Sequence, residues 1–421
     1  MGIVLNLANS VVGEESCLAD TVDDQKCGQT SAARKEKESA VYVIGDLHGD
    51  EYCARYWVKK TGLIDDSSRR WVDPSRKLVF LGDYVDKGPT SKQTVEFVKS
   101  LTEDFPDNVV ALMGNHEFEL LLDRDARNRD SWNGLLFHQL SYASVHPQEY
   151  LNFLGPDEVD PIIDPQVVDA LYNASIEVYG SYQHRDYAFA SPGDYSGKHH
   201  RSILQLVRND LREQVQERLT LYQQRYLDAF RTGTELGTWL EQRPVIAQSN
   251  DTIFVHGGIS HVALSMLLAR HGVQGTNQLL AVNAKEGKLY EFIRHTREGR
   301  AIYDLLVYRG NHQDSACSEL YHLLRPIAGA TRLAVGHTPG NKVRIQCTAS
   351  KDGGNSYGIF LALDSSLSRW FRNSGNEYCP GDVRKVSSNG RYECQKKQDE
   401  CEGQIIKIEN GLVDIIDSST S

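Results

Sequence analysis

Five apolar runs of β-forming residues, each followed by glycine and polar side chains, constrain the fold of this chain most strongly. The runs cover residues 41–44, 77–81, 109–113, 252–255 and 332–335. Buried parallel strands have continuous apolar sequences, and their carboxyl ends bring side chains to one edge of a sheet. The pattern therefore predicts an α/β fold in which polar residues collect at the strand ends.

The polar residues after these runs are of the types that bind divalent metals. Their motifs are Gly45-Asp46-Leu47-His48-Gly49, Gly82-Asp83-Tyr84-Val85-Asp86-Lys87-Gly88, Gly114-Asn115-His116-Glu117, His256-Gly257-Gly258 and Gly336-His337-Thr338. Asp46 and His48 lie two residues apart on a turn, so both can face one ion. We expect Asp83 to bridge two ions, the second of which is completed by Asn115, His256 and His337. Mixed carboxylate, amide and imidazole ligands favour manganese, iron or zinc over a magnesium or calcium cage.

Two such ions suit hydrolytic phosphoryl transfer. Two divalent metals about 3.5–4 Å apart lower the pKa of a bound water and clamp phosphate oxygens. We expect His116 to be the general acid toward the leaving oxygen, oriented by the carboxylate of Asp86. Arg309 is the candidate for binding two phosphate oxygens at once through its guanidinium group, and Lys87 could supply a second positive charge. Asn115 is also expected to face the substrate, and Glu117 to brace its turn.

Single matches of this kind have simpler explanations. A lone Gly-Asp or a lone histidine is usually a turn or a core residue, and Asp86 taken alone could cap the following helix. The occurrence of all five motifs in this order favours the metal-site interpretation for the six ligands and His116. The remaining histidines outside the motifs, including His138, His146, His184, His199 and His200, are expected on the surface or in a helical cap.

Bulk properties exclude several classes of protein. The 421 residues carry a formal net charge of −11, which argues against an extended nucleic-acid surface. No apolar stretch reaches the roughly 18 residues that span a bilayer. The first residues lack the basic region of a signal peptide, so a cytoplasmic location is predicted.

The eight cysteines show no CxxC pair and no zinc-finger spacing. They are therefore expected to be ordinary thiols in a reducing compartment. A disulfide within the late cluster Cys379, Cys394 and Cys401 stays open as an alternative if the protein is exported.

The motifs also organise the chain. Residues 1–40 are polar and without periodicity, which predicts a flexible tail, and 41–370 form the predicted catalytic domain. Within that domain, about 118–250 should be a helical insertion that caps the site, because such an interval is too long for a simple connection. Residues 371–421 are predicted as a C-terminal extension, with a closing hairpin at 404–416.

In their order along the chain, the five motifs resemble the signature of the phosphoprotein phosphatase family of calcineurin-like metallophosphoesterases. The resemblance covers roughly residues 41–365. It implies a four-layer α/β/β/α sandwich with a dinuclear centre at the strand ends between two mixed sheets, and the same ligand assignment.

Many other metallophosphoesterases carry a second histidine where this chain has Pro339. The first ion is then left with Asp46, His48, Asp83 and water, which disfavours purple acid phosphatases and phosphodiesterases.

Within that family, residues 45–50, 250–260 and 308–310 look most like the Shewanella-like phosphatases. Lys87 departs from the arginine usual there, and residues 87–91 are closer to the diadenosine-tetraphosphatase-like branch. Lysine offers a point charge where arginine offers a planar fork, so this difference bears on the substrate.

Three functions follow from these observations. The leading hypothesis is a phosphatase that acts on Ser, Thr or Tyr phosphate in proteins or peptides. The alternative is a pyrophosphohydrolase of dinucleoside polyphosphates, RNA caps or polyphosphate. The third is an inactive scaffold, but such proteins normally lose ligands or the acid, and this chain has all six ligands and His116.

Overall fold

The computed structural model describes residues 40–127, 145–171, 205–313, 316–351, 354–371, 382–386, 392–396 and 400–419. All of them belong to one compact unit, Glu38–Ser421. The predicted tail lies outside the described residues. No helix in the described part of the chain is long and apolar enough to cross a membrane.

Two mixed five-stranded sheets form the centre of the unit. The first has the order β12-β11-β1-β2-β3, and the second has the order β4-β5-β6-β8-β7. Strands of the first are β1 (Val41–Ile44), β2 (Lys77–Phe80), β3 (Val109–Ala111), β11 (Gln404–Glu409) and β12 (Leu412–Asp417). Strands of the second are β4 (Ile246–Ser249), β5 (Thr252–Val255), β6 (Arg332–Val335), β7 (Arg344–Lys351) and β8 (Gly354–Ala362). The five predicted apolar runs supply β1, β2, β3, β5 and β6.

Side chains of these strands alternate between two apolar clusters. Val41 and Val43 of β1 belong to a cluster that also contains Phe254 and Leu361 of the other sheet. Their neighbours in the chain pack instead into the larger cluster shared with the helices. Strands β1, β5 and β6 are therefore buried on both faces, which explains why their sequences are continuously apolar rather than alternating.

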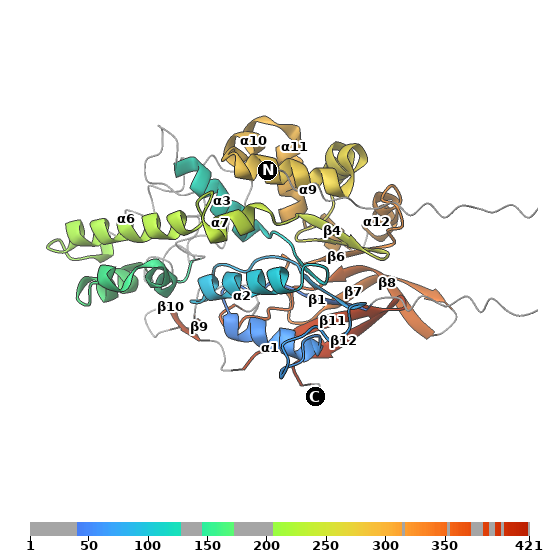
Figure 1. Ribbon diagram of the computed structural model, residues 1–421, viewed down its shortest axis with the longest axis horizontal. Helices are drawn as coiled ribbons and strands as arrows, with labels where there is room; N and C mark the ends of the chain where they lie inside the picture. The colour runs from blue at the N-terminus through green and yellow to red at the C-terminus, as the bar shows by residue number, and fades with distance from the viewer. Residues whose placement is uncertain are drawn as a thin grey trace, which may run out of the picture. The chain divides into compact units, whose positions relative to one another are not determined.

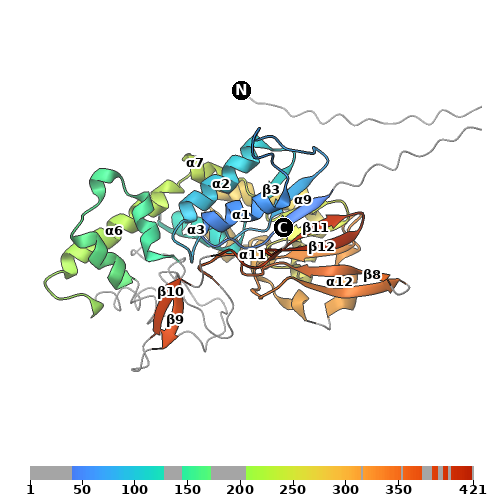
Figure 2. The same ribbon diagram turned by 90° about the horizontal axis from the view of Figure 1, so that it is seen from below.

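Helices cover the outer face of each sheet (Figures 1 and 2). On the first sheet lie α1 (Glu51–Thr61) and α2 (Ser91–Asp104). On the second lie α9 (Ala269–Lys285), α11 (Arg297–Val307) and α12 (Ala316–Leu324), accompanied by α8 (His261–Ala263), η4 (Leu264–Leu268), α10 (Leu289–His295) and η5 (Gly310–His312). The predicted four-layer sandwich is thus confirmed. The long helical interval between β5 and β6 was not predicted from the sequence.

The interval between β3 and β4 is helical where it is described. It contains α3 (Asn115–Arg127), η2 (Pro147–Phe153), η3 (Pro156–Glu158), α6 (Arg212–Ala229) and α7 (Glu235–Glu241). Residues 128–144 and 172–204 of the predicted insertion lie outside the described residues. Its start differs from the prediction, because α3 begins at Asn115, so two of the candidate site residues stand on the first turn of a helix.

The predicted hairpin is present at the end of the chain. Asn410 and Gly411 have φ values of 52° and 75°, as a tight two-residue hairpin turn requires. Strand β11 pairs antiparallel with β1, at the centre of the first sheet. The last strands are therefore part of the first sheet. A separate two-stranded sheet is formed by β9 (Asp382–Val386) and β10 (Tyr392–Lys396).

Two disulfides overturn the expectation that all cysteines are free thiols. Cys53 of α1 is bonded to Cys401, 348 residues later, and Cys317 of α12 is bonded to Cys347 of β7. Neither pair was foreseen, because only the tertiary structure brings these residues together. Cys401 pairs with α1 and not within its late cluster. The side chains of Cys379 and Cys394 lie outside the described residues.

Candidate metal centre

Asp83 is the centre of the candidate site. It follows β2 after a turn at Gly82, which has a φ of 106° and lies against the backbone of Gly114. A Cβ at Gly82 would lie 2.4 Å from the amide nitrogen of Gly114, so a larger residue would separate the two turns. Glycine at these positions therefore lets the second and third motifs meet.

Four donor atoms converge on one side of Asp83. Its Oδ2 lies 3.2 Å from Nε2 of His256, which lies 3.1 Å from Oδ1 of Asn115. That amide oxygen is 2.9 Å from Nδ1 of His337. Nδ1 of His256 is 2.9 Å from the carbonyl of Leu81, and donation there leaves the lone pair of Nε2 facing the group. These are the four residues predicted to surround the second ion.

Asp46 and His48 lie on the other side of Asp83. Nε2 of His48 is 3.8 Å from Oδ2 of Asp46 and 3.8 Å from Oδ2 of Asp83. The backbone amide of His337 donates to Asp46, which links the first and last motifs. The structure therefore brings all six predicted ligands to one place, from β-strands of both sheets.

The buried carboxylates of the candidate site have shifted pKa values. Burial opposes ionisation of Asp83, but the surrounding imidazoles, led by His256 and His116, hold its pKa well below the usual range. Burial and the neighbouring carboxylate of Asp364 raise the pKa of Asp46 well above its usual range. A cation between these carboxylates would relieve that repulsion.

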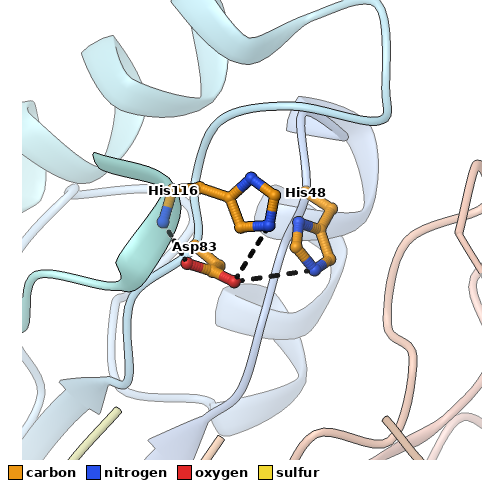
Figure 3. Close-up of side chains that lie close together, drawn as sticks. All are labelled: His48, Asp83 and His116. Carbon is orange, nitrogen blue, oxygen red and sulfur yellow. Dashed lines mark hydrogen bonds and ion pairs between the residues drawn. The ribbon is translucent and has the colours of Figure 1, made fainter. Parts of the chain in front are cut away.

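His116 projects into the same group from the first turn of α3. Figure 3 shows the rings of His116 and His48 both directed at the carboxylate of Asp83. Nε2 of His116 lies 3.8 Å from Oδ2 of Asp83, and Nδ1 lies 2.5 Å from Oδ2 of Asp86. Burial lowers the pKa of His116, but the two carboxylates more than offset it, so the pKa is raised above its ordinary value. Asp86 therefore orients His116 and does not cap α2, whose N-cap is Thr90.

Glu117 braces the turn, as predicted. Its two carboxylate oxygens accept hydrogen bonds from the backbone amides of Asp83, Tyr84, Val85 and Gly114, over distances of 2.7–3.0 Å. One buried side chain thus holds the backbone of two motifs in register.

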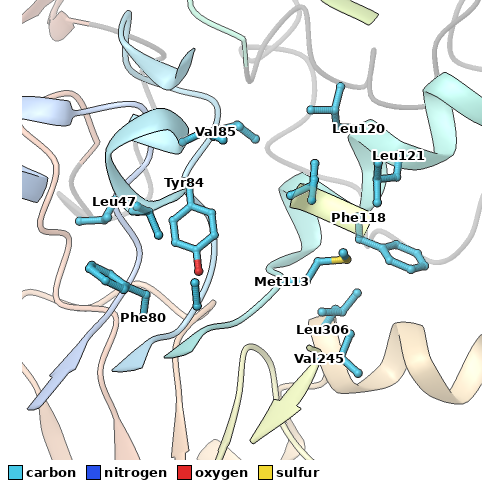
Figure 4. Packing of buried hydrophobic residues seen from close by; sticks show 14 of the residues in the cluster. Leu47, Phe80, Tyr84, Val85, Met113, Phe118, Leu120, Leu121, Val245 and Leu306 are labelled. Atoms are coloured by element: carbon cyan, nitrogen blue, oxygen red, sulfur yellow. The ribbon is translucent and has the colours of Figure 1, made fainter. Parts of the chain in front are cut away.

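The residues between the ligands anchor the turns in the core. Figure 4 shows Leu47, Tyr84 and Val85 packed among apolar side chains that include Phe80. Tyr84 also donates its hydroxyl to the carbonyl of Leu112 at 2.6 Å. In the first two motifs, core residues therefore lie between the polar residues, which directs one set toward the site and the other away from it.

The ligand turns adopt uncommon backbone conformations. Positive φ values occur at His48 (43°), Asp83 (54°), Asp86 (73°), Lys87 (68°) and His337 (64°). Left-handed conformations are uncommon in residues other than glycine, and they concentrate at functional sites, where the surrounding structure holds them. The glycines that flank these motifs allow the backbones to approach closely enough to do so.

The two predicted phosphate-binding cations occupy different environments. Arg309 is solvent-exposed at the N-cap of η5, close enough to Asp364, Asp46 and Asp83 to interact with their charge. Lys87 is buried, with Nζ 3.1 Å from Nε2 of His48 and 3.9 Å from the ring centre of Phe371.

Sequence reasoning missed the segment that follows β8. Ser368 donates to the carbonyl of His48, and Arg369 makes paired hydrogen bonds to the carboxylate of Asp50, the N-cap of α1. The ring of Phe371 packs edge-on against His48. A signal was available, because the apolar run 359–363 is followed by Asp364, the same pattern as in the five recognised motifs.

The donor set fits divalent metals. Among the described residues, Asp83 shares one potential ion site with His256 and His337, and another with His48 and His116. Nitrogen and oxygen donors around a bridging carboxylate are suited to a pair of transition-metal ions. Two mixed sheets with such donors at their strand ends are the arrangement that the resemblance to metallophosphoesterases implies.

Residues 39–172 match the sequence profile of the calcineurin-like phosphoesterases. It is 38% identical over 87 residues to a Shewanella-like protein phosphatase 2 from Arabidopsis thaliana, covering 20% of this chain and 22% of the relative. It is 37% identical over 110 residues to an asymmetrical bis(5′-nucleosyl)-tetraphosphatase from Geobacillus, covering 25% and 43%.

Both branches suggested by the sequence are thus among its relatives, and the chain spans less than half the length of each. A cold-active protein-tyrosine phosphatase of a psychrophilic Shewanella has an 18% identical sequence and a TM-score of 0.49, over 90% of this chain and 80% of that one.

Proposed function

We propose that this protein is a dinuclear metal-dependent phosphatase that hydrolyses phosphate monoesters on Ser, Thr or Tyr of proteins. The observation that carries the proposal is the convergence of Asp46, His48, Asn115, His256 and His337 on Asp83, with His116 beside them. The similarity to a protein phosphatase supports the substrate class.

Each residue has a role in this proposal. Asp46, His48 and Asp83 would hold one ion, and Asp83, Asn115, His256 and His337 the other, with manganese, iron or zinc suited to these donors. When bound, such a pair of ions supplies an activated water and neutralises phosphate charge. His116, held by Asp86, carries the proton for the leaving oxygen, since the two neighbouring carboxylates raise its pKa and favour the protonated ring.

Arg309 is the proposed entry-side contact for the phosphate, since it is exposed and faces the carboxylate group. The nucleotide pyrophosphohydrolase remains the second candidate, because Lys87 lies within the site and one relative is a bis(5′-nucleosyl)-tetraphosphatase. A positive charge at this place would suit a longer anionic chain.

The predicted cytoplasmic location fits poorly with two disulfides, which persist mainly in oxidising environments. We therefore propose an oxidising compartment for the protein.

A direct comparison of substrates tests the function. Purified protein loaded with manganese is assayed against phosphoserine, phosphothreonine and phosphotyrosine peptides and against diadenosine tetraphosphate, with Asp83→Asn as the matched inactive control. We expect phosphate release from the peptides that Asp83→Asn abolishes. Turnover of the dinucleotide alone would reject the protein phosphatase in favour of the second candidate, and no metal-dependent turnover would favour the scaffold.

A further inference from the structure

A carboxylate at a sixth strand end lies inside the candidate centre. Asp364 follows β8 by two residues and is 2% exposed. Strand β8 pairs in parallel with β6, whose own end leads to His337. The carboxyl ends of the two strands therefore meet at the same edge of the second sheet, and Asp364 occupies a place equivalent to those of the recognised ligands.

Backbone packing places Asp364 against Asp46. A Cβ on Gly45 would lie 2.5 Å from the carbonyl oxygen of Leu363 and 3.4 Å from Cα of Asp364. Glycine at position 45 thus lets the first motif lie directly on the segment after β8. The carboxylate of Asp364 is the strongest charged neighbour of Asp46, and Asp83 is the next carboxylate.

The two carboxylate oxygens of Asp364 have different surroundings. Oδ1 accepts from the backbone amide of Ser366 at 3.1 Å. Oδ2 is buried, and no backbone amide or basic side chain of the described residues donates to it. Asp46 can donate to Asp364 only while Asp46 carries a proton, which lowers the pKa of Asp364. When both carboxyls are ionised, the buried oxygen has no donor, which is costly. A cation between them satisfies both.

We infer that Asp364 is a further protein ligand of the first ion, joining Asp46, His48 and Asp83. The inference rests on the proposed dinuclear function. With Asp46, His48 and Asp83 alone, that ion has only three protein donors. A carboxylate from the neighbouring strand would supply the missing donor, and carboxylate oxygen suits manganese or iron.

The test compares wild type with Asp364→Asn and Asp364→Ala. Manganese binding is measured by equilibrium dialysis with elemental analysis, and thermal unfolding is recorded with and without manganese. Asparagine keeps an oxygen for the amide of Ser366 but removes the charge. We expect both variants to bind the weaker of the two ions at least 10-fold less tightly, while the other ion is retained. Asp364→Asn should also unfold at a higher temperature than wild type without metal, because repulsion with Asp46 is relieved.

If Asp364 only stabilises the local backbone and binds no metal, the variants should behave differently. Asp364→Asn would then behave as wild type in both measurements, and only Asp364→Ala would lose stability, which overturns the inference. Asp83→Asn is the reference, since loss of the bridging carboxylate should weaken both ions. If wild type itself binds no pair of ions, the proposed dinuclear function fails. Two ions bound equally by wild type and Asp364→Asn would refute only the role of Asp364.

Discussion

Nδ1 of His116 lies 2.5 Å from Oδ2 of Asp86, in a pair that is almost entirely buried beside Asp83. The carboxylate fixes the ring with Nε2 directed into the site. It also favours the imidazolium form, which raises the pKa of His116 despite burial. The pair therefore has the geometry of a general acid and its orienting carboxylate.

Replacing Asp86 with Asn should impair reactions that need a protonated leaving group. We expect kcat for a phosphoserine peptide to fall about 10²–10⁴-fold, and the high-pH limb of its pH profile to move to lower pH because the pKa of His116 falls. Hydrolysis of para-nitrophenyl phosphate should fall less, since nitrophenolate leaves without a proton. His116→Ala should show the same difference between substrates. Equal losses on both substrates would argue that the pair does not deliver the proton.

Glu117→Gln should destabilise the protein, because the side chain is fully buried and accepts several backbone hydrogen bonds. The amide can accept at one oxygen only, while its NH2 group faces backbone donors that the carboxylate now satisfies. We expect a loss of about 1–3 kcal/mol in the free energy of unfolding. Urea unfolding measures it. Glu103→Gln changes a carboxylate that is itself exposed and leaves Lys99 paired with Glu235, so it is the control and should change stability by less than about 0.5 kcal/mol. Similar values for both variants would contradict the bracing role.

The disulfide between Cys53 and Cys401 should add to stability, because it joins α1 to the segment before β11 across most of the chain. Cys401→Ser should cost about 2–4 kcal/mol. Mass spectrometry of a non-reduced digest should recover the two cysteines in one linked pair of peptides. Adding a reductant should destabilise wild type more than Cys401→Ser. An unlinked pair in oxidised protein would contradict this prediction.

Glu149 should make stability depend on pH. Its carboxylate accepts from the amides of Ser91 and Lys92 at the start of α2, and burial raises its pKa from 4.5 to about 8. The folded protein then retains a proton that the unfolded chain has lost between those values, so the free energy of unfolding should fall as pH rises through this window and level off above it.

Glu149→Gln cannot ionise, so its unfolding free energy should vary less with pH across the same window. Urea unfolding of both proteins at pH 5, 6, 7 and 8 measures the difference in slope. Parallel curves would show that Glu149 ionises in the folded state as readily as in the unfolded chain.

Much of the fold could be predicted because strands buried on both faces leave a strong local pattern. The runs around Val43 and Phe254 are apolar throughout, and each is followed by the glycine and polar residues of a ligand turn. Asn410-Gly411 likewise encodes its hairpin turn directly, since both residues tolerate positive φ. The helical interval between β5 and β6 was missed, because it carries no residue of the metal motifs.

The sequence predicted which residues make up the candidate site, but it did not predict which other residues contact them. Motif order and residue type predicted six ligands and His116, and the structure brings these side chains together. By contrast, Asp364 and Phe371 belong to a segment with no recognised motif, and the pairing of Cys53 with Cys401 joins positions 348 residues apart. Contacts of that kind depend on how distant segments pack, which no local pattern records.

The amino-acid sequence alone determined where strands end and which donor atoms stand there, because these properties depend on neighbouring residues. Only the tertiary structure decided which distant side chains interact. It places Asp364 next to Asp46 and Lys87 next to His48. It also places the carboxylate of Glu117 where the backbone amides of two turns donate to it. The physical reason is that electrostatic and hydrogen-bond energies depend on distances of a few ångströms between residues that are far apart in the chain.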